Sequence, residues 1–351
     1  MLLEETLEKI APLDRSIESE AQKRLDSLTK PQGSLGRMEE LAHRICCIQG
    51  IVPPRLGRKL LFVFAADHGV TEEGVSAYPK EVTAQMTYNF VNGGAAINVL
   101  ARHYGIEVQV IDVGVDYDFP KLKSLRGLKV RRGTNNFARG PAMTRDEAVR
   151  SIETGIRLVD EIARENPFLL GAGEMGIGNT TSAAAIFSAL SGLAARDVTG
   201  RGTGVDDKTW ATKVATIEHG LKLNQPAPDD PLDVLAKVGG LEIGAMAGVM
   251  LGAAAHRVPM VLDGYISAAA ALLAVRMNPN VRRTLIASHL SAENGHRAML
   301  DQLSLAPLLD LNMRLGEGTG ACLAMGLAEA AIKIVREMAT FDSAGIKEKI
   351  L

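Results

Sequence analysis

The chain has 351 residues, of which 46% are hydrophobic, 23% charged and 4% aromatic, and its formal net charge is −2. This length and apolar content can bury a large core in one big domain or two modest ones. A nucleic-acid-binding protein needs a basic face, and a protein that stacks single strands needs many aromatic side chains. This composition has neither, so we expect no nucleic-acid partner.

The cysteines and the N-terminal residues favour a cytoplasmic protein. Cys46 and Cys47 are adjacent and Cys322 lies far from both, without the CxxC or Cys/His spacing of a zinc site. Residues 1–16 are acidic and amphipathic, unlike a basic and apolar leader. Apolar runs such as 268–275 are too short to cross a bilayer. We therefore expect buried thiols in a reducing compartment, no metal site and no membrane partner.

Helical patterns come first along the chain, and strands alternating with helices follow. Residues 1–50 are helical in pattern, with apolar side chains at helical spacing over 36–49. The predicted strands are short apolar runs at 60–66, 108–113, 168–170, 258–262 and 284–287. The predicted helices include 81–91, a stretch ending near 103, a helix opened by the capping box of Thr144 and Glu147, and a helix from about 180. This alternation predicts an α/β fold with a parallel sheet.

The end of the chain adds one more helix. Residues 319–340 are Ala-rich and helical in pattern, and neither they nor the N-terminal helices include a strand. We infer a small helical subdomain made of residues 1–55 and 320–351, beside an α/β catalytic domain of residues 56–319.

Four polar or glycine-rich loops directly follow predicted strands, at 67–69, 171–181, 263–265 and 288–291. Ligands of open parallel sheets bind outside the carboxyl ends of the strands. We therefore expect these loops, including Asp263, to converge on one crevice. Every strand-to-helix loop of such a fold lies on that edge, whether or not it is used.

The loop at 171–181 is the best candidate for an anion site. Gly173, Gly176 and Gly178 let the backbone approach a ligand, and residues 179–181 can cap the next helix. A phosphate there would meet free N–H groups and the positive end of a helix. The loop is not a Walker A motif, because no Gly-Lys-Ser/Thr follows. An ordinary tight turn with capping remains the alternative.

A second glycine-rich stretch spans residues 200–207. Its two aspartates resemble those of diphosphate-ribose loops, but here they follow the Thr-Gly pair and no strand precedes them. We therefore expect no magnesium–pyrophosphate site here. A loop that covers a phosphate, with help from Lys213, fits better.

Two further loops carry titratable side chains that allow two interpretations each. Glu317 lies between Gly316 and Gly318 just before a helix, where it is either a complement to the helix dipole or a catalytic carboxylate. Asp67-His68 follows the first strand, where the histidine either bonds nearby backbone or begins a metal site that His289 and His296 would complete. No carboxylate-rich partner loop supports the metal interpretation.

Six blocks of sequence together resemble one family, the nicotinate-nucleotide–dimethylbenzimidazole phosphoribosyltransferases. The blocks are residues 28–36, 66–70, 173–181, 237–240, 262–264 and 314–318. They occur in order and with compatible spacing, and the resemblance runs from about residue 25 to 335. It implies a Rossmann-like parallel sheet flanked by helices, the helical subdomain described above, and a homodimer.

The resemblance also implies a reaction and roles for residues. The 5-phosphoribosyl group of nicotinate mononucleotide would pass to 5,6-dimethylbenzimidazole or a related base, giving α-ribazole 5′-phosphate and nicotinate. Glu317 would be the general base, and Glu174 would lie near the ribose and base. The candidates for phosphate and ribose binding are Gly176, Ile177, Gly178, Asn179, Thr180, Thr181, Gly202, Thr203, Gly204 and Ser291, besides Lys213 and Asp263. The candidates for base binding are Pro79, Met86, Met313 and Leu315, with Tyr78.

Tyr78 departs from the family pattern, which has a small residue before the proline. A bulky phenol at the rim of the pocket leaves the identity of the acceptor base open.

The implied chemistry requires neither metal nor cofactor. The leaving group is already a cationic pyridinium, and the attacking benzimidazole needs only a base to take its N–H proton. Attack opposite the leaving group would invert C1′. Two alternatives stay open: a metal-dependent phosphoryl-transfer or phosphatase enzyme built on Asp67-His68, and a relative that binds a nucleotide without turnover.

Overall fold

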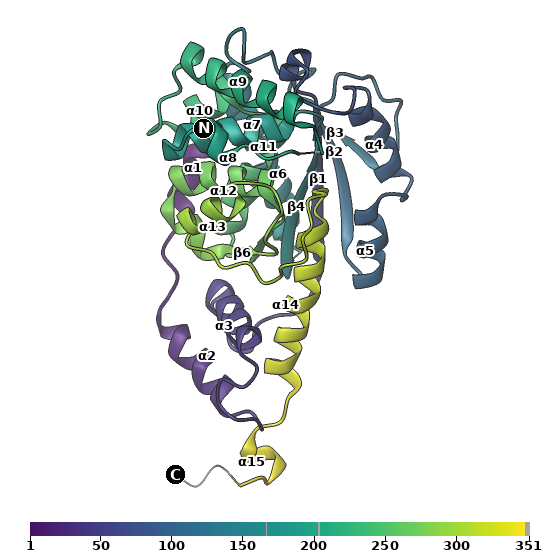
Figure 1. The fold of residues 1–351 in the computed structure, drawn as a ribbon. Coiled ribbons are helices and arrows are strands. Elements are labelled where there is room, and N and C mark those ends of the chain that lie inside the picture. Colours follow the sequence, from purple (N-terminus) through teal and green to yellow (C-terminus); the bar gives the residue numbers. More distant parts are fainter. Residues whose placement is uncertain (166, 203, 348–351) are drawn as a thin grey trace.

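Six parallel strands form one sheet in the computed structural model, which describes residues 1–165, 167–202 and 204–347. The strands lie in the order β3-β2-β1-β4-β5-β6. Their bounds are β1 Lys59–Ala66, β2 Glu107–Gly114, β3 Leu125–Gly127, β4 Leu169–Met175, β5 Met260–Leu262 and β6 Leu285–Ala287. The predicted α/β fold with a parallel sheet is confirmed (Figure 1).

Two predictions about strands were wrong. The edge strand β3 was missed, because Leu125–Gly127 is short, partly exposed and lacks an apolar run. Residues 171–175 were taken as a loop but belong to β4. Gly173 is required there by packing rather than by a turn, since a Cβ on it would lie 2.3 Å from the backbone carbon of Glu317. The loop proper is reduced to residues 176–178.

The side chains of β1 alternate between two hydrophobic clusters, one on each face of the sheet. Phe62 and Phe64 belong to the first cluster, and Leu61 and Val63 to the second. The first face is covered by α1 Leu2–Lys9, α6 Arg145–Ala163, α7 Asn179–Ser191, α8 Ala195–Val198, α9 Asp207–Asn224, α10 Pro231–Val238, α11 Leu241–Ala255, α12 Tyr265–Met277 and α13 His296–Gln302. The second face is covered by α4 Val82–Val91, α5 Ala96–Tyr104 and α14 Thr319–Glu337, and α2 Ser16–Asp26 and α3 Arg37–Gln49 extend the same hydrophobic cluster beyond the sheet.

Three short elements complete the described part of the chain. They are the 3-10 turns η1 Gly69–Glu73 and η2 Pro279–Thr284 and the C-terminal α15 Phe341–Ala344. The capping box predicted for α6 is confirmed: the Thr144 hydroxyl accepts from Glu147 N–H at 3.2 Å, and the Glu147 carboxylate accepts from Thr144 N–H at 2.8 Å. None of the described helices is long and apolar enough to cross a membrane.

The helices α2 and α3 form an extension below the sheet, where α3 packs against both α2 and α14 (Figure 1). Thr29 N–H donates to Ala339 O at 3.0 Å, which joins the two ends of the chain there. Helix α1 instead packs against α6 and α11. The division into a helical subdomain and an α/β domain remains a prediction.

The strand order reverses between β1 and β4. From β1 the chain moves outward to β2 and β3, and it then returns to continue on the other side with β4, β5 and β6. The loops that leave β1 and β4 therefore run toward opposite faces, which opens a crevice at the carboxyl ends of these strands.

Candidate active site

A cleft of about 730 Å³ lies at the carboxyl ends of β4, β5 and β6. Three of the four predicted loops contribute to its walls, and the Asp67-His68 loop does not. The predicted site residues that line the cleft are Tyr78, Met86, Glu174, Gly176, Ile177, Gly178, Asn179, Thr180, Gly202, Lys213, Asp263, Ser291, Leu315 and Glu317. Residues so distant in sequence meet because the carboxyl ends of all the parallel strands lie at the same edge of the sheet.

Four further candidates do not line the cleft. Thr181 is fully buried within α7, and Gly204 lines a neighbouring cavity. Pro79 and Met313 do not appear in the wall of the cleft, and Thr203 lies outside the described residues. The cleft also has lining residues that were not named as site candidates, among them Arg201, Glu293 and Arg314. His289, which the sequence offered only as a possible metal ligand in a converging loop, lines the cleft too. Arg314 belongs to the same sequence block as Glu317, which was a signal that could have identified it.

Glu317 is held in a left-handed backbone conformation with φ of 62°. Gly316 and Gly318 on either side also have positive φ, 85° and 88°, so the chain makes a tight turn that presents the carboxylate to the cleft. The side chain is buried, and its Oε2 atom has no hydrogen-bond partner. Burial raises the pKa of Glu317, the backbone of Ile97 opposes that rise, and the negative charge of Asp263 adds to it.

Asp263 fixes the turn that carries Glu317. One carboxylate oxygen accepts from Gly318 N–H at 3.0 Å, and the other accepts from Gly320 N–H at 2.7 Å and Ala321 N–H at 3.2 Å. These N–H groups belong to the first turn of α14, whose positive end favours a carboxylate. Asp263 therefore joins the end of β5 to the start of α14.

Glu174, the penultimate residue of β4, faces the same turn. A Cβ on Gly316 would lie 2.3 Å from its Oε1, and Asn179 Nδ2 donates to its Oε2. Burial raises the pKa of Glu174 to about 8, and the neighbouring carboxylates of Asp263 and Glu242 add to the shift. Glu174 is thus mainly protonated at neutral pH and can donate a hydrogen bond.

One end of the cleft is built for an anion. Lys213 is buried, and its Nζ donates to the Thr180 hydroxyl at 2.7 Å. The first turn of α7 begins at Gly178, and Gly202 approaches so closely that a Cβ on it would lie 3.3 Å from Lys213 Nζ. Burial lowers the pKa of Lys213 to about 8, which Glu293 opposes. An ammonium group beside free helix N–H groups suits a phosphate.

The other end of the cleft is apolar. Its wall includes Val75, Val82, Met86, Met175 and Ile177. Tyr78 and Leu315 also line it and are 53% and 57% exposed, so they stand at its rim. A flat aromatic molecule fits this end, because such pockets are mostly apolar with a few polar groups that fix orientation.

His68 does not face the cleft. Its Nε2 atom lies 2.6 Å from Glu242 Oε1 and its Nδ1 atom 3.0 Å from the Ser182 hydroxyl. Within the described residues, no group of three His, Cys, Asp or Glu side chains is placed to hold a metal ion. The donor set expected for a metal-dependent phosphatase is therefore not assembled around Asp67-His68.

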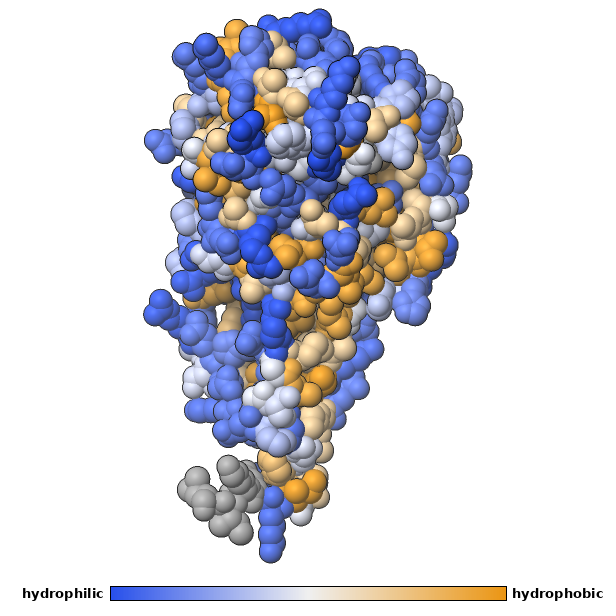
Figure 2. All heavy atoms as spheres, viewed as in Figure 1, coloured by the Kyte–Doolittle hydropathy of each residue, from blue (hydrophilic) through white to orange (hydrophobic). Residues whose placement is uncertain are grey.

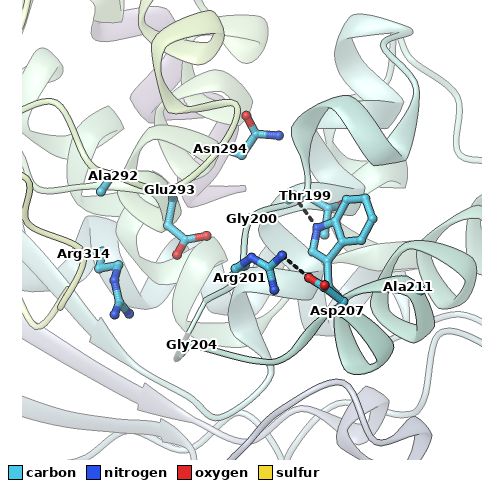
Figure 3. Close-up of a pocket in the computed structure, with 11 residues that line it drawn as sticks. Thr199, Gly200, Arg201, Gly204, Asp207, Ala211, Ala292, Glu293, Asn294 and Arg314 are labelled. Atoms are coloured by element: carbon cyan, nitrogen blue, oxygen red, sulfur yellow. Dashed lines mark hydrogen bonds and ion pairs between the residues drawn. The ribbon is translucent and has the colours of Figure 1, made fainter.

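A second cavity of about 620 Å³ adjoins the anion end (Figure 3). It shares Arg201, Glu293 and Arg314 with the cleft. The Glu293 carboxylate accepts from Gly202 N–H at 3.1 Å, and Arg314 donates to Gly202 O at 3.2 Å. These contacts hold the glycine-rich loop between the two cavities.

Comparison with known proteins agrees with this geometry. A family model described as phosphoribosyltransferase matches residues 10–346, and the fold, the cleft and this match define the chain as a phosphoribosyltransferase. The nicotinate-nucleotide–dimethylbenzimidazole phosphoribosyltransferases of Geobacter sulfurreducens and Chloroflexus aggregans are 60% and 56% identical to it, each over 99% of both chains. The crystal structure of CobT from Thermus thermophilus superposes with a TM-score of 0.91 at 48% identity, covering 95% of this chain and 100% of that one. The chain belongs to the nicotinate-nucleotide–dimethylbenzimidazole phosphoribosyltransferase family.

Proposed function

We propose that the enzyme transfers the 5-phosphoribosyl group of nicotinate mononucleotide to 5,6-dimethylbenzimidazole or a related base, with Glu317 as the general base. The observation that carries this proposal is the position of Glu317, a buried carboxylate with an unpartnered oxygen between an anion-binding end and an apolar end. The named activity of the relatives supports the same reaction.

The 5′-phosphate would bind Lys213, Thr180 and the N-terminal turn of α7, and the acceptor base would lie between Met86 and Leu315. One ring nitrogen of the base attacks C1′ with its lone pair. The bond from C1′ to the pyridinium nitrogen breaks, and nicotinate leaves with that electron pair. Glu317 takes the proton from the other ring nitrogen, and the configuration at C1′ inverts.

Positive charge spreads over the ribose as the pyridinium bond lengthens. Asp263 and Glu317 would stabilise that charge by their carboxylates, and protonated Glu174 would donate to a ribose hydroxyl. Holding both substrates in line lowers the barrier further, because oriented reactants avoid a large loss of translational freedom.

A homodimer would cover a hydrophobic face of α14. Its residues Leu323, Leu327, Ala330 and Ile334, with Met338 at the C-cap, follow helical spacing and are at least partly exposed. Figure 2 shows hydrophobic side chains gathered along this helix. A second copy of the chain is the occupant we propose. A cytoplasmic location is part of the same proposal.

The function is tested by incubating the enzyme with nicotinate mononucleotide and a panel of benzimidazoles and purines, with products identified by mass spectrometry. We expect release of nicotinate and an equimolar α-ribosyl phosphate of one or more bases. Binding of both substrates without nicotinate release would instead support a non-catalytic relative. Activity that EDTA abolishes and a divalent metal restores would support the metal-dependent alternative.

A further inference from the structure

His68 and Glu242 form a charged or strongly polar pair in the interior of the enzyme. Both side chains have 0% exposure, and Ser182, which contacts the other ring nitrogen, has 1%. The three residues come from separate segments: His68 lies between β1 and η1, Glu242 in the first turn of α11 and Ser182 in the first turn of α7. A serine, a histidine and a carboxylate in contact resemble a nucleophilic triad, but no substrate can reach a serine so deeply buried.

The imidazole lies directly beneath the loop that follows β4. A Cβ on Gly176 would be 3.3 Å from His68 Nε2, and one on Gly178 would be 3.5 Å from His68 Cβ. On the opposite side, a Cβ on Gly240 would be 2.4 Å from His68 Cε1. The ring is therefore enclosed by glycine backbone, and two of those glycines line the floor of the cleft.

Such a pair is costly to bury. Taking a carboxylate out of water carries a large desolvation penalty, and an apolar replacement of equal volume is often as stable or more so. The Oε2 atom of Glu242 has no hydrogen-bond partner either, which adds to that cost. A stabilising role is thus a weak explanation for this pair, whereas a role in fixing the geometry of the cleft accounts for its position.

We propose that His68 and Glu242 are positioning residues for the transfer reaction, which hold the residue 176–178 loop and the first turn of α7 in the geometry that binds the phosphoribosyl group. The proposal rests on the function proposed above. Ser182 completes the contact, because it ties the imidazole to the helix whose N-terminus forms the anion end.

The pair also acts on Glu174 through charge. Glu174 faces the carboxylates of Asp263 and Glu242, the amide of Asn179 and the backbone of Glu317. The negative charge of Glu242 helps to raise the pKa of Glu174 and so keeps it protonated. The location of the pair therefore affects both the shape of the loop and the protonation of a group in the cleft.

The test compares Glu242→Gln and Ser182→Ala with wild type. Glu242→Gln keeps an oxygen that can accept from His68 but removes the charge. We expect kcat/KM to fall about 10- to 100-fold in both variants, since small misplacements of substrate are this costly. In Glu242→Gln the alkaline limb of the kcat–pH profile should also move to lower pH, because loss of a neighbouring negative charge lowers the pKa of Glu174.

A matched control is available at the other end of α11. There His256 Nε2 lies 2.7 Å from Asp160 Oδ1 in an exposed pair, so His256→Gln removes the same kind of contact away from the cleft. It should leave kcat/KM and the pH profile unchanged. If Glu242→Gln does not fold, the test rests on Ser182→Ala. That variant removes only one hydroxyl and should fold, because the same helix continues with Ala183, Ala184 and Ala185.

The proposal is overturned if the variants lose only thermal stability while kcat/KM stays within twofold of wild type and the pH profile is unchanged. Calorimetric binding of nicotinate mononucleotide is measured in parallel, and we expect weaker binding in Ser182→Ala. A wild-type enzyme that binds this nucleotide but releases no nicotinate with any base would instead refute the proposed function. The two failures are therefore distinguishable.

Discussion

Glu317 has the properties that a general base for a weakly acidic N–H group requires. Its burial raises its pKa from the ordinary value toward neutrality, which makes the ionised form a stronger proton acceptor. Its Oε2 atom is buried and has no hydrogen-bond partner, and an N–H group of a bound base would satisfy it. Lys213 at the anion end and the apolar side chains around Met86 set the two substrates on either side of it.

We predict that Glu317→Gln lowers kcat by about 10²–10⁴-fold, because positioned acid–base catalysis is worth this much. Gln has the same shape, so both substrates should still bind. Single-turnover release of nicotinate measures the effect. The control is Glu72→Gln, which alters an exposed carboxylate paired with Arg139. Turnover within tenfold of wild type would assign the proton to another acceptor.

The pH dependence of the rate should separate two groups. Above a pH of about 8, Glu174 loses its proton and Lys213 loses its charge. Both losses should lower kcat/KM, which reports the free enzyme, and loss of the Glu174 proton should also lower kcat, which reports the enzyme–substrate complex. Steady-state rates from pH 5 to 10 measure both. Profiles that stay flat from pH 7 to 10 would contradict these assignments.

At the scale of elements, the start of α14 is the part of the fold on which the cleft most depends. The helix begins at Thr319, directly after Gly318 of the Glu317 turn. The N–H groups of Gly318 and Gly320 at its start donate to Asp263, which follows β5. The sheet and the helix are thereby fixed to one another beside the cleft.

Replacing Asp263 with Ala should reduce both stability and activity. Buried N–H groups left without a partner cost about 1–3 kcal/mol each, and the Glu317 turn would lose its anchor. Asp230→Ala is the matched control, because Asp230 caps α10 through Leu232 N–H and Asp233 N–H away from the cleft. We expect thermal unfolding to report a loss in both variants and kcat/KM to fall only in Asp263→Ala. Equal activity in the two variants would refute a role of Asp263 in the cleft.

The elements that could be predicted from the sequence were those with a local signal. The buried run of β1 and the Thr144 capping box of α6 each specify an element without help from the rest of the chain. The edge strand β3 has no such signal, because its residues extend a sheet that is already formed. The extent of β4 was missed for another reason. Gly171 and Gly173 suggested a turn, whereas Gly173 lies in the strand and its small size is required by the backbone of the Glu317 turn.

At the scale of the whole molecule, the site also combines residues that have a local sequence signal with residues whose roles depend on distant contacts. Glu317, Glu174 and Lys213 were identified from their sequence blocks or loops and meet in one cleft. The role of Asp263 as an anchor for α14 and the inward orientation of His68 could not be predicted, since both depend on which distant backbone groups approach them. Because Asp263 and His68 directly follow strands, the sequence could place them at the carboxyl edge of the sheet. It could not predict the direction in which each side chain points.

Association of two chains should follow from the hydrophobic face of α14. Light scattering should give twice the 37.4 kDa mass of one chain. Changing both Leu327 and Ile334 to Lys should produce monomers, because two charges cannot be buried in an apolar interface without a large cost. Leu223→Lys, an exposed leucine of α9, is the control and should leave the mass unchanged. A wild-type protein that is monomeric at micromolar concentration would refute the homodimer.

The left-handed backbone conformation of Glu317 lowers the stability of the fold at a residue that the proposed reaction needs. A non-glycine residue in this conformation costs of order 1–3 kcal/mol, and a buried carboxylate without a partner adds to that cost. Replacement of Glu317 with Gly would relieve both and should yield a more heat-resistant protein that no longer turns over. Selection for thermal stability alone would therefore tend to discard Glu317, the carboxylate that we propose as the general base, so any evolution experiment on this enzyme must impose activity in every round.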